Sequence, residues 1–221
     1  ANSNRRHTSS ACWRVRGWRS LKKIAAHNRT TSPARRRFIP VELLLKLIND
    51  VIDLSNLDPG KLTFNFKECD AVNICRNVIN TVEKVKQTQA GVSFVTSLDK
   101  LTLRTDEARL QQVLINLLIN ATKFTTEGSI TLTLEKESET IALFTVTDTG
   151  CGILREKQDQ IFNRFEKLNE GAQGTGLGLS ICQLIIEQIG GRIWIDPDYT
   201  EGARFRFTHP VRPAKEKEAE R

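Results

Sequence analysis

The sequence lacks any apolar run long enough to cross a membrane. Its most apolar stretch, residues 113–121, is interrupted by Asn116 and Asn120, whereas a spanning helix needs roughly 20 consecutive apolar residues. The N-terminal residues also lack the apolar core of a secretory signal peptide. We therefore expect no membrane segment in this chain and a cytoplasmic location, while a larger parent protein could still carry a membrane anchor.

Paired cysteines are also missing. The chain has five cysteines, an odd number, and no two of them form a C-x-x-C pair. This usage disfavours a disulfide framework and a zinc site, and it fits a reducing cytosol.

Acidic residues are absent from the first 37 positions, which hold nine Arg and two Lys. The other 184 residues carry 22 basic and 26 acidic side chains, so the net charge of +7 comes from the N-terminal segment. Charge alone supports only non-specific association, and Trp13 and Trp18 are not spaced as a stacking platform. We therefore expect no nucleic-acid binding.

Residues 1–37 have neither helical nor strand periodicity, which predicts a disordered basic segment. From Phe38 onward, apolar residues recur at spacings of three and four over residues 41–54, which is typical of an amphipathic helix. This helix ends at the Asp58-Pro59-Gly60 turn. We assign residues 38–58 to this helical segment, 61–212 to one folded domain and 213–221 to a charged tail.

Within 61–212 the order of periodicities predicts an α+β fold, in which one sheet carries helices on one face. Expected strands cover residues 62–66, 92–97, 129–134, 141–147, 192–196 and 203–208. Expected helices cover residues 70–86, 106–124, 157–165 and 179–189. Capping residues at Thr105-Asp106 start the second of these helices, and Gly190-Gly191 ends the last.

The helix over 106–124 carries two stripes. One is apolar and belongs to the core. The other is polar and contains Arg109, Gln112, Asn116, Asn120 and Lys123. A solvated face would explain the polar stripe, but Ile115 and Ile119 border it and Asn is a mediocre helix former. We therefore predict a polar pocket, in which amide oxygens ligate a hard cation and Lys123 neutralises phosphate.

Asp148 follows the strand over 141–147, on the same face as Phe144 and Val146. A carboxylate at a strand end is often a turn cap. Gly150 and Gly152 favour a ligand site instead, because glycine lets a bulky ligand approach the backbone closely. The carboxylate could then accept a hydrogen bond from an exocyclic amine.

Glycines also precede the helix over 179–189, in Gly174-Thr175-Gly176-Leu177-Gly178. A glycine-rich loop at a helix N-terminus offers N–H groups and a favourable dipole to phosphate, although such a loop alone is also consistent with a simple turn. It is neither a Walker loop nor a Rossmann fingerprint, because no Gly-Lys-Ser/Thr follows and no strand leads directly into it.

Four motifs occur in order: Asn116-x-x-x-Asn120-Ala121-x-Lys123-Phe124, Asp148-Thr149-Gly150-Cys151-Gly152-Ile153, Phe162-Asn163-Arg164-Phe165 and Gly174-Thr175-Gly176-Leu177-Gly178-Leu179. They closely resemble the N box, first glycine box, F box and second glycine box of the ATP-binding catalytic domain of bacterial sensor histidine kinases, hybrid kinases included. The resemblance covers about residues 41–212 and implies a two-layer α/β sandwich of the Bergerat type. Residues 38–58 then resemble the second helix of a dimerisation and phosphoacceptor hairpin.

The resemblance implies a role for each matched residue. Asn116 would ligate Mg²⁺, Asn120 would help to hold ATP, and Lys123 would face its phosphates. Asp148 would accept from the adenine amino group, and Lys167 would reach the γ-phosphate. The other matched positions would line the adenine, anchor a lid over residues 166–174 or wrap the triphosphate: Phe124, Gly150, Gly152, Ile153, Phe162, Phe165, Gly174, Thr175, Gly176, Leu177, Gly178 and Leu179.

The phosphoacceptor motif of that family, of the form His-Glu-x-x-Arg/Thr-Pro, is missing. His7 and His27 lack the neighbouring acid, and His209 ends the last expected strand. Two explanations of residues 1–37 stay open: a stretch read out of frame, or a natural basic tail on a truncated kinase. We therefore expect ATP binding without autophosphorylation of this chain, and a weakened homodimer.

The expected partners are those of the family, namely a response-regulator receiver domain or the hairpin of an intact kinase. The leading hypothesis is transfer of the ATP γ-phosphoryl group to a histidine in two-component signalling. The alternative is an ATP-binding module of the same fold that has no kinase activity and acts by associating with a partner. ATP hydrolysis of the gyrase type is disfavoured, because Asn116 and Asn120 are amides where those ATPases use a carboxylate.

Overall fold

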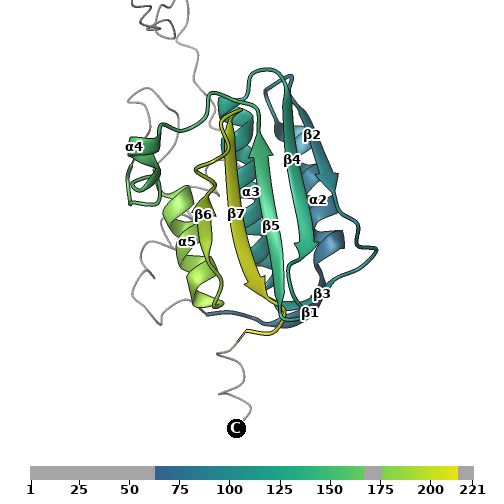
Figure 1. Ribbon diagram of the computed structural model, residues 1–221. Coiled ribbons are helices and arrows are strands. Elements are labelled where there is room, and N and C mark those ends of the chain that lie inside the picture. Colours follow the sequence, from purple (N-terminus) through teal and green to yellow (C-terminus); the bar gives the residue numbers. More distant parts are fainter. Residues whose placement is uncertain (1–62, 167–175, 214–221) are drawn as a thin grey trace, which may run out of the picture. The chain divides into compact units, whose positions relative to one another are not determined.

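The computed structural model describes residues 63–166 and 176–213. Within these ranges the chain forms a five-stranded sheet, a two-stranded sheet and four helices (Figure 1). The strands are β1 (Lys67–Asp70), β2 (Gly91–Val95), β3 (Thr102–Thr105), β4 (Ser129–Lys136), β5 (Ile141–Asp148), β6 (Ile193–Ile195) and β7 (Ala203–Pro210). The helices are α2 (Ala71–Val85), α3 (Glu107–Phe124), α4 (Arg155–Gln158) and α5 (Gly178–Gln188).

The larger sheet has the strand order β2-β4-β5-β7-β6. β2 and β4 pair in parallel, and the other neighbours pair antiparallel. Figure 1 shows α2 and α3 behind this sheet, and α5 packs against α3 and β6. Within the described residues, the opposite face of the sheet carries no helix. The α+β, two-layer architecture predicted from the sequence is confirmed.

Periodic apolar residues explain this packing. The buried apolar residues of α2 and α3 include Val72, Cys75, Val78, Val82, Leu110, Val113, Leu114, Leu117 and Leu118. Opposite them, Phe144 of β5 and Phe207 of β7 stack at a centroid separation of 4.6 Å. Asp70 and Asp106 cap the two helices, since each carboxylate accepts from a first-turn backbone N–H at 3.1 Å. Capping and periodicity therefore fix where both helices begin and which side they bury.

Some sequence predictions of local structure are wrong. The strand expected over residues 62–66 is not found in the described residues 63–66. These residues alternate in burial, but β1 begins only at Lys67, where its pairing with β3 starts. The periodicity does not predict β3, a four-residue strand that makes a second sheet with β1. The helix expected over 157–165 is replaced by α4 and a series of turns. Phe165 has a φ of 64°, which no right-handed helix accommodates.

Several predictions fall outside the described residues. They concern the disordered segment 1–37, the helical segment 38–58 with its hairpin role, the lid from residue 167 onward and the charged tail from residue 214. The weakened homodimer depends on that hairpin and stays a prediction. Along the described part of the chain, no helix combines the length and the apolar character that a membrane span requires.

His209 connects the two sheets through the core. Its side chain on β7 is fully buried. Nδ1 lies 2.6 Å from the carbonyl oxygen of Pro210, which can only accept, so Nδ1 carries the proton. Nε2 then accepts from the hydroxyl of Thr105 on β3 at 2.9 Å. Burial lowers the pKa of His209 to about 4, and the enclosed ring cannot serve as a phosphoacceptor.

Candidate functional site

Asp148 lies at the end of β5 and is 3% exposed. Its Oδ1 accepts from the backbone N–H of Gly150 at 2.9 Å and from that of Ala203 at 3.3 Å. Ala203 is the first residue of β7, so the carboxylate is held between the loop after β5 and the neighbouring strand. Oδ1 therefore caps a turn, as the alternative interpretation of Asp148 predicted. The two hydrogen bonds to Oδ1 also fix the direction of the carboxylate.

The burial of Asp148 affects the pKa of its carboxyl group. Burial raises the pKa of its carboxyl group above the ordinary value, and the two backbone N–H groups and the side chain of Thr125 partly offset that effect. A buried carboxylate that remains ionised is a strong and oriented acceptor. Such a group suits the exocyclic amine that the sequence predicts as its ligand.

The backbone around Asp148 is too crowded for ordinary side chains. A Cβ on Gly150 would lie 2.4 Å from the carbonyl oxygen of Phe124, and a Cβ on Gly202 would lie 2.0 Å from that of Asp148. Gly152 has a φ of 68°, and its Cβ would lie 2.9 Å from the carbonyl oxygen of Gly202. Gly202 is a further residue of this site that the sequence does not single out, since its only signal is its place directly before an alternating strand.

Asn116 lies on α3 and faces the start of α5. It is 2% exposed, and a Cβ on Gly178 would lie 3.7–3.8 Å from three atoms of its side-chain amide. The amide nitrogen Nδ2 has no hydrogen-bond partner within the described residues. Leaving a buried donor unpaired costs about 1–3 kcal/mol. A bound ligand would remove that cost, and the burial contradicts the solvated-face alternative for Asn116.

Metal binding at Asn116 would depend on a nucleotide. The described residues contain no group of three or more His, Cys, Asp or Glu that could hold a cation. Hard cations prefer oxygen ligands, and Mg²⁺ is commonly held by few protein groups together with substrate phosphates. The amide oxygen of Asn116 with phosphate oxygens is such a set, so the residues present fit the predicted Mg²⁺.

The start of α5 offers N–H groups to an anion. Its N-cap residue, Leu177, has an apolar side chain that cannot accept from the first turn. Just before it, Gly176 has a φ of 75°, and its carbonyl oxygen accepts from the backbone N–H of Phe165 at 3.0 Å. This bond joins the F box to the second glycine box. A helix N-terminus without a side-chain cap is suited to phosphate.

The two F-box aromatics have different surroundings. Phe162 is half-buried and meets Phe205 of β7 edge-on, with ring centroids 6.4 Å apart. Phe165 is 66% exposed and immediately precedes the end of the first described range. Phe162 therefore packs against the sheet, whereas the side chain of Phe165 adds little packing, and the anchoring of a lid by either residue stays a prediction.

The structure brings most of the predicted residues to one end of α3. Asn120 and Phe124 are half-buried there and Lys123 is exposed. The backbone N–H of Cys151 donates to the carbonyl oxygen of Phe124 at 3.3 Å and ties the first glycine box to α3. Three residues pack against or within the core: Ile153, Leu177 and Leu179. Three predicted residues lie outside the described ranges: Lys167, Gly174 and Thr175.

Replacing Gly178 by Ala should separate stability from ligand binding. The new methyl group meets only ordinary contacts at 3.7 Å, so unfolding should become harder by about 0.4–1 kcal/mol. The same methyl group narrows the gap beside Asn116, so ATP affinity should fall about fivefold, or about 1 kcal/mol. Urea unfolding and calorimetric titration measure the two effects. A variant with unchanged ATP affinity would show that no phosphate passes this position.

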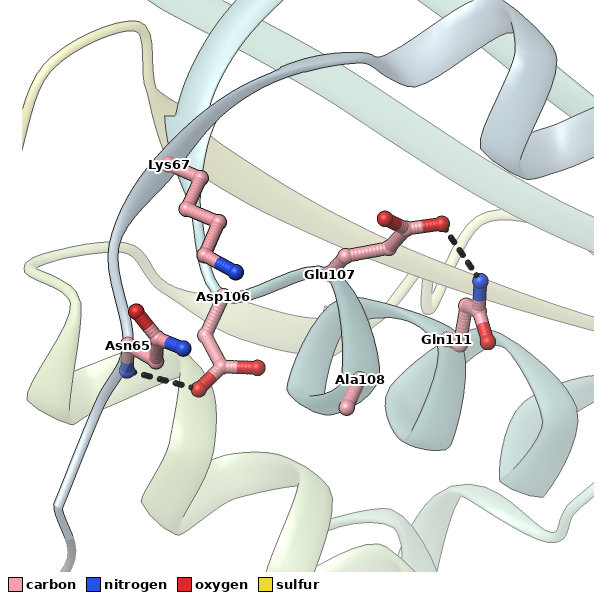
Figure 2. Close-up of a pocket in the computed structure, with 6 residues that line it drawn as sticks. All are labelled: Asn65, Lys67, Asp106, Glu107, Ala108 and Gln111. Carbon is pink, nitrogen blue, oxygen red and sulfur yellow. Dashed lines mark hydrogen bonds between the residues drawn. The ribbon is translucent and has the colours of Figure 1, made fainter.

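A separate hollow lies at the opposite end of α3 (Figure 2). It has a volume of about 320 Å³ and is lined by Asn65, Lys67, Asp106, Glu107, Ala108 and Gln111. The backbone N–H of Asn65 donates to Asp106 Oδ2 at 2.8 Å, which ties the chain before β1 to the cap of α3. None of the predicted site residues lines this hollow, so it is distinct from the candidate site.

Comparison with known sequences gives a consistent result. The family model described as histidine kinase-, DNA gyrase B- and HSP90-like ATPase matches residues 105–213. The circadian input-output histidine kinase CikA of Synechococcus elongatus is 36% identical over 177 residues, which are 76% of this chain and 23% of CikA. The adaptive-response sensory kinase SasA of Prochlorococcus marinus is 34% identical over 190 residues, which are 83% of this chain and 50% of SasA. The chain thus spans half or less of these relatives.

Solved structures show the same relationship. Full-length ShkA in complex with AMPPNP has a TM-score of 0.69 at 29% identity, covering 77% of this chain and 36% of ShkA. The catalytic domain of the histidine kinase ThkA has a TM-score of 0.60 at 34% identity, covering 67% of this chain and 99% of that domain. ThkA in complex with the response regulator TrrA has a TM-score of 0.66 at 29% identity, covering 84% of this chain and 54% of ThkA.

Proposed function

Because this chain belongs to the histidine kinase-, DNA gyrase B- and HSP90-like ATPases and contains the ATP-binding catalytic domain of a histidine kinase, we propose that it binds Mg-ATP and transfers the γ-phosphoryl group to a histidine. The reaction would serve two-component signalling. The acceptor histidine would come from another hairpin, since the one histidine within the described residues, His209, is buried.

One arrangement supports the proposal above all others. A buried carboxylate, Asp148, and a buried amide with an unpaired nitrogen, Asn116, lie on adjacent elements that pack against each other. Asn116 is eight residues before Phe124, or about 12 Å along the helix axis, and Phe124 accepts from the loop that follows Asp148. This spacing suits a ligand with an amine-bearing ring at one end and phosphates at the other.

Each residue would act by binding and orientation. Asp148 would hold the adenine amine, with Gly150, Gly152 and Ile153 shaping that end. Asn116 and the N-terminus of α5 would hold the phosphates, with Asn120, Lys123 and the glycine loop. Bound Mg²⁺ would supply charge neutralisation. Phosphoryl transfer needs little more from the protein than positioning and electrostatic stabilisation.

The partners follow from the same reasoning. ThkA has been solved with its response regulator TrrA, and we propose a receiver domain of that kind as the final phosphate acceptor. The first acceptor would be the hairpin of an intact kinase, because no acid-flanked histidine is present in this sequence.

Labelled ATP tests the proposal directly. The 221-residue chain is incubated with γ-labelled ATP and Mg²⁺, alone and with a kinase hairpin whose own catalytic domain has been removed. We expect acid-labile label on the hairpin only, and none on this chain. An Asn116→Leu variant should lose this transfer, while an Asp99→Asn variant, changed at an exposed position, should keep it.

Two outcomes would contradict the proposal in different ways. Label on His7 or His27 of this chain would show that the chain carries its own acceptor. ATP binding without label on any hairpin would favour the alternative, a module that binds ATP and acts by association alone.

A further inference from the structure

Thr125, the residue directly after α3, has a buried hydroxyl group close to the Asp148 carboxylate. The residue is 0% exposed, and its Oγ1 has no partner with full hydrogen-bond geometry within the described part of the chain, although the hydroxyl lies near enough to Asp148 to lower the pKa of that carboxyl group. Its backbone is fixed on both sides: the N–H donates to the carbonyl oxygen of Ala121 at 3.0 Å, and the carbonyl oxygen accepts from the Thr88 hydroxyl. Leaving a buried hydroxyl without a well-formed hydrogen bond costs free energy. We therefore expect this hydroxyl to form one when the protein binds its ligand.

The hydroxyl lies beside the carboxylate of Asp148. A Cβ on Gly150 would lie 2.8 Å from Thr125 Oγ1 and 2.9 Å from Asp148 Oδ1. The two oxygens therefore border the same space beside Gly150, which is too narrow for a methyl group. They come from different elements, the C-terminal end of α3 and the end of β5, and a side chain at position 150 would separate them.

We propose that Thr125 is a positioning residue for adenine recognition, donating its hydroxyl proton to the Asp148 carboxylate when ATP is bound. This inference rests on the proposed function. Hydrogen bonds at binding sites are often long without ligand and shorten in the complex. The donated proton keeps the carboxylate ionised and directed at the exocyclic amine, so Thr125 contributes without touching the nucleotide.

The surroundings of Asp148 make such a donor useful. Burial raises the pKa of the carboxyl group, and a hydrogen bond to the ionised form opposes that effect. The strand neighbours of Asp148 are Ile130 on β4 and Ala203 on β7, and both are apolar.

The other titratable or charged groups near Asp148 stay the same in every variant tested. Tyr199 interacts electrostatically with Asp148, and burial above all raises the pKa of its phenol, so Tyr199 stays neutral at acid and neutral pH. Glu201 precedes β7, Lys123 lies at the end of α3, and Cys151 lies in the loop after β5. A change in the pH dependence of ATP binding can therefore be assigned to Thr125.

The test measures ATP affinity of the full chain from pH 5 to pH 8 by calorimetry. Thr125→Val keeps the shape of the side chain and removes the donor, so Asp148 should protonate at higher pH. We expect the loss of affinity at acid pH to begin about one pH unit higher than in the unchanged chain, or about a tenfold weaker affinity at a given acid pH. Titration of the ATP phosphates is common to all variants and cancels in the comparison.

Three further variants complete the test. Thr125→Ala should give the same shift, which keeps the inference testable if the valine variant does not fold. Thr125→Ser restores the hydroxyl and should restore the original pH dependence. Thr122→Val makes the same chemical change one turn earlier, where the hydroxyl bonds the carbonyl oxygen of Ile119, and should shift nothing.

The failures of the two proposals can be told apart. Suppose that the unchanged chain binds ATP and that the folded Thr125→Val and Thr125→Ala variants lose ATP affinity at the same acid pH as the unchanged chain. The role of Thr125 is then overturned and the proposed function stands. If the unchanged chain binds no ATP, both are overturned.

Discussion

Replacing Asp148 by Asn should lower the affinity of the chain for Mg-ATP by roughly 10- to 100-fold. The Asn amide oxygen can still accept from the backbone N–H groups of Gly150 and Ala203, so the local fold should persist. The charge of the acceptor is lost, and a hydrogen bond to a charged group contributes about 1.5–3 kcal/mol. Calorimetric titration at neutral pH measures the change in affinity.

An Asp99→Asn variant is the matched control for this experiment. Asp99 is exposed and lies outside the candidate site, so its replacement removes the same charge without touching the binding groups. Its ATP affinity should equal that of the unchanged chain. If Asp148→Asn also binds ATP with unchanged affinity, the Asp148 carboxylate does not recognise the adenine amino group.

The stability of the domain should fall as the pH is lowered from 6.5 to 4. Burial lowers the pKa of His209 from 6.5 to about 4 in the folded state. Between these values the unfolded chain binds a proton that the folded chain does not. The stability is therefore fully present above pH 6.5 and is lost as the pH falls. The gap between the two pKa values corresponds to about 3 kcal/mol, which urea unfolding at several pH values can measure.

A His209→Phe variant isolates the contribution of this histidine. Phenylalanine does not titrate, so the pH dependence between 6.5 and 4 should become nearly flat, although the bond to Thr105 is lost. Asp148 acts in the opposite direction, because its raised pKa lets the folded state bind a proton first. An equally steep loss of stability in the variant would assign the effect to another group.

Long periodic elements of the fold were predictable from the sequence. The helix expected over 106–124 is found at Glu107–Phe124, because a capping aspartate and five turns of apolar periodicity specify one structure. The strands over 129–134 and 141–147 are also found, since alternating residues bury one face. β3 was not predictable, because four residues carry too little alternation and the strand depends on pairing with β1.

The chemistry of the candidate site was more predictable than its geometry. Asn116 and Asp148 could be identified from the sequence because polar side chains among apolar neighbours need a hydrogen-bond partner or a ligand. Gly202 and Thr125 did not stand out, because each matters only through contact with Asp148 or its loop, which the sequence separates from both. The bond between His209 and Thr105 joins residues 104 positions apart and has no local signal.

The position of β7 in the sheet has a consequence for biosynthesis. β7 is the last strand to leave the ribosome among the described residues, yet it lies between β5 and β6. Until residues 203–210 emerge, β5 has an open edge and β6 has no strand to pair with. Such non-local pairing is slow, and open strand edges favour aggregation. The pairs β2–β4 and β4–β5 can form as they are synthesised, whereas completion of the sheet through β6 has to follow the synthesis of β7.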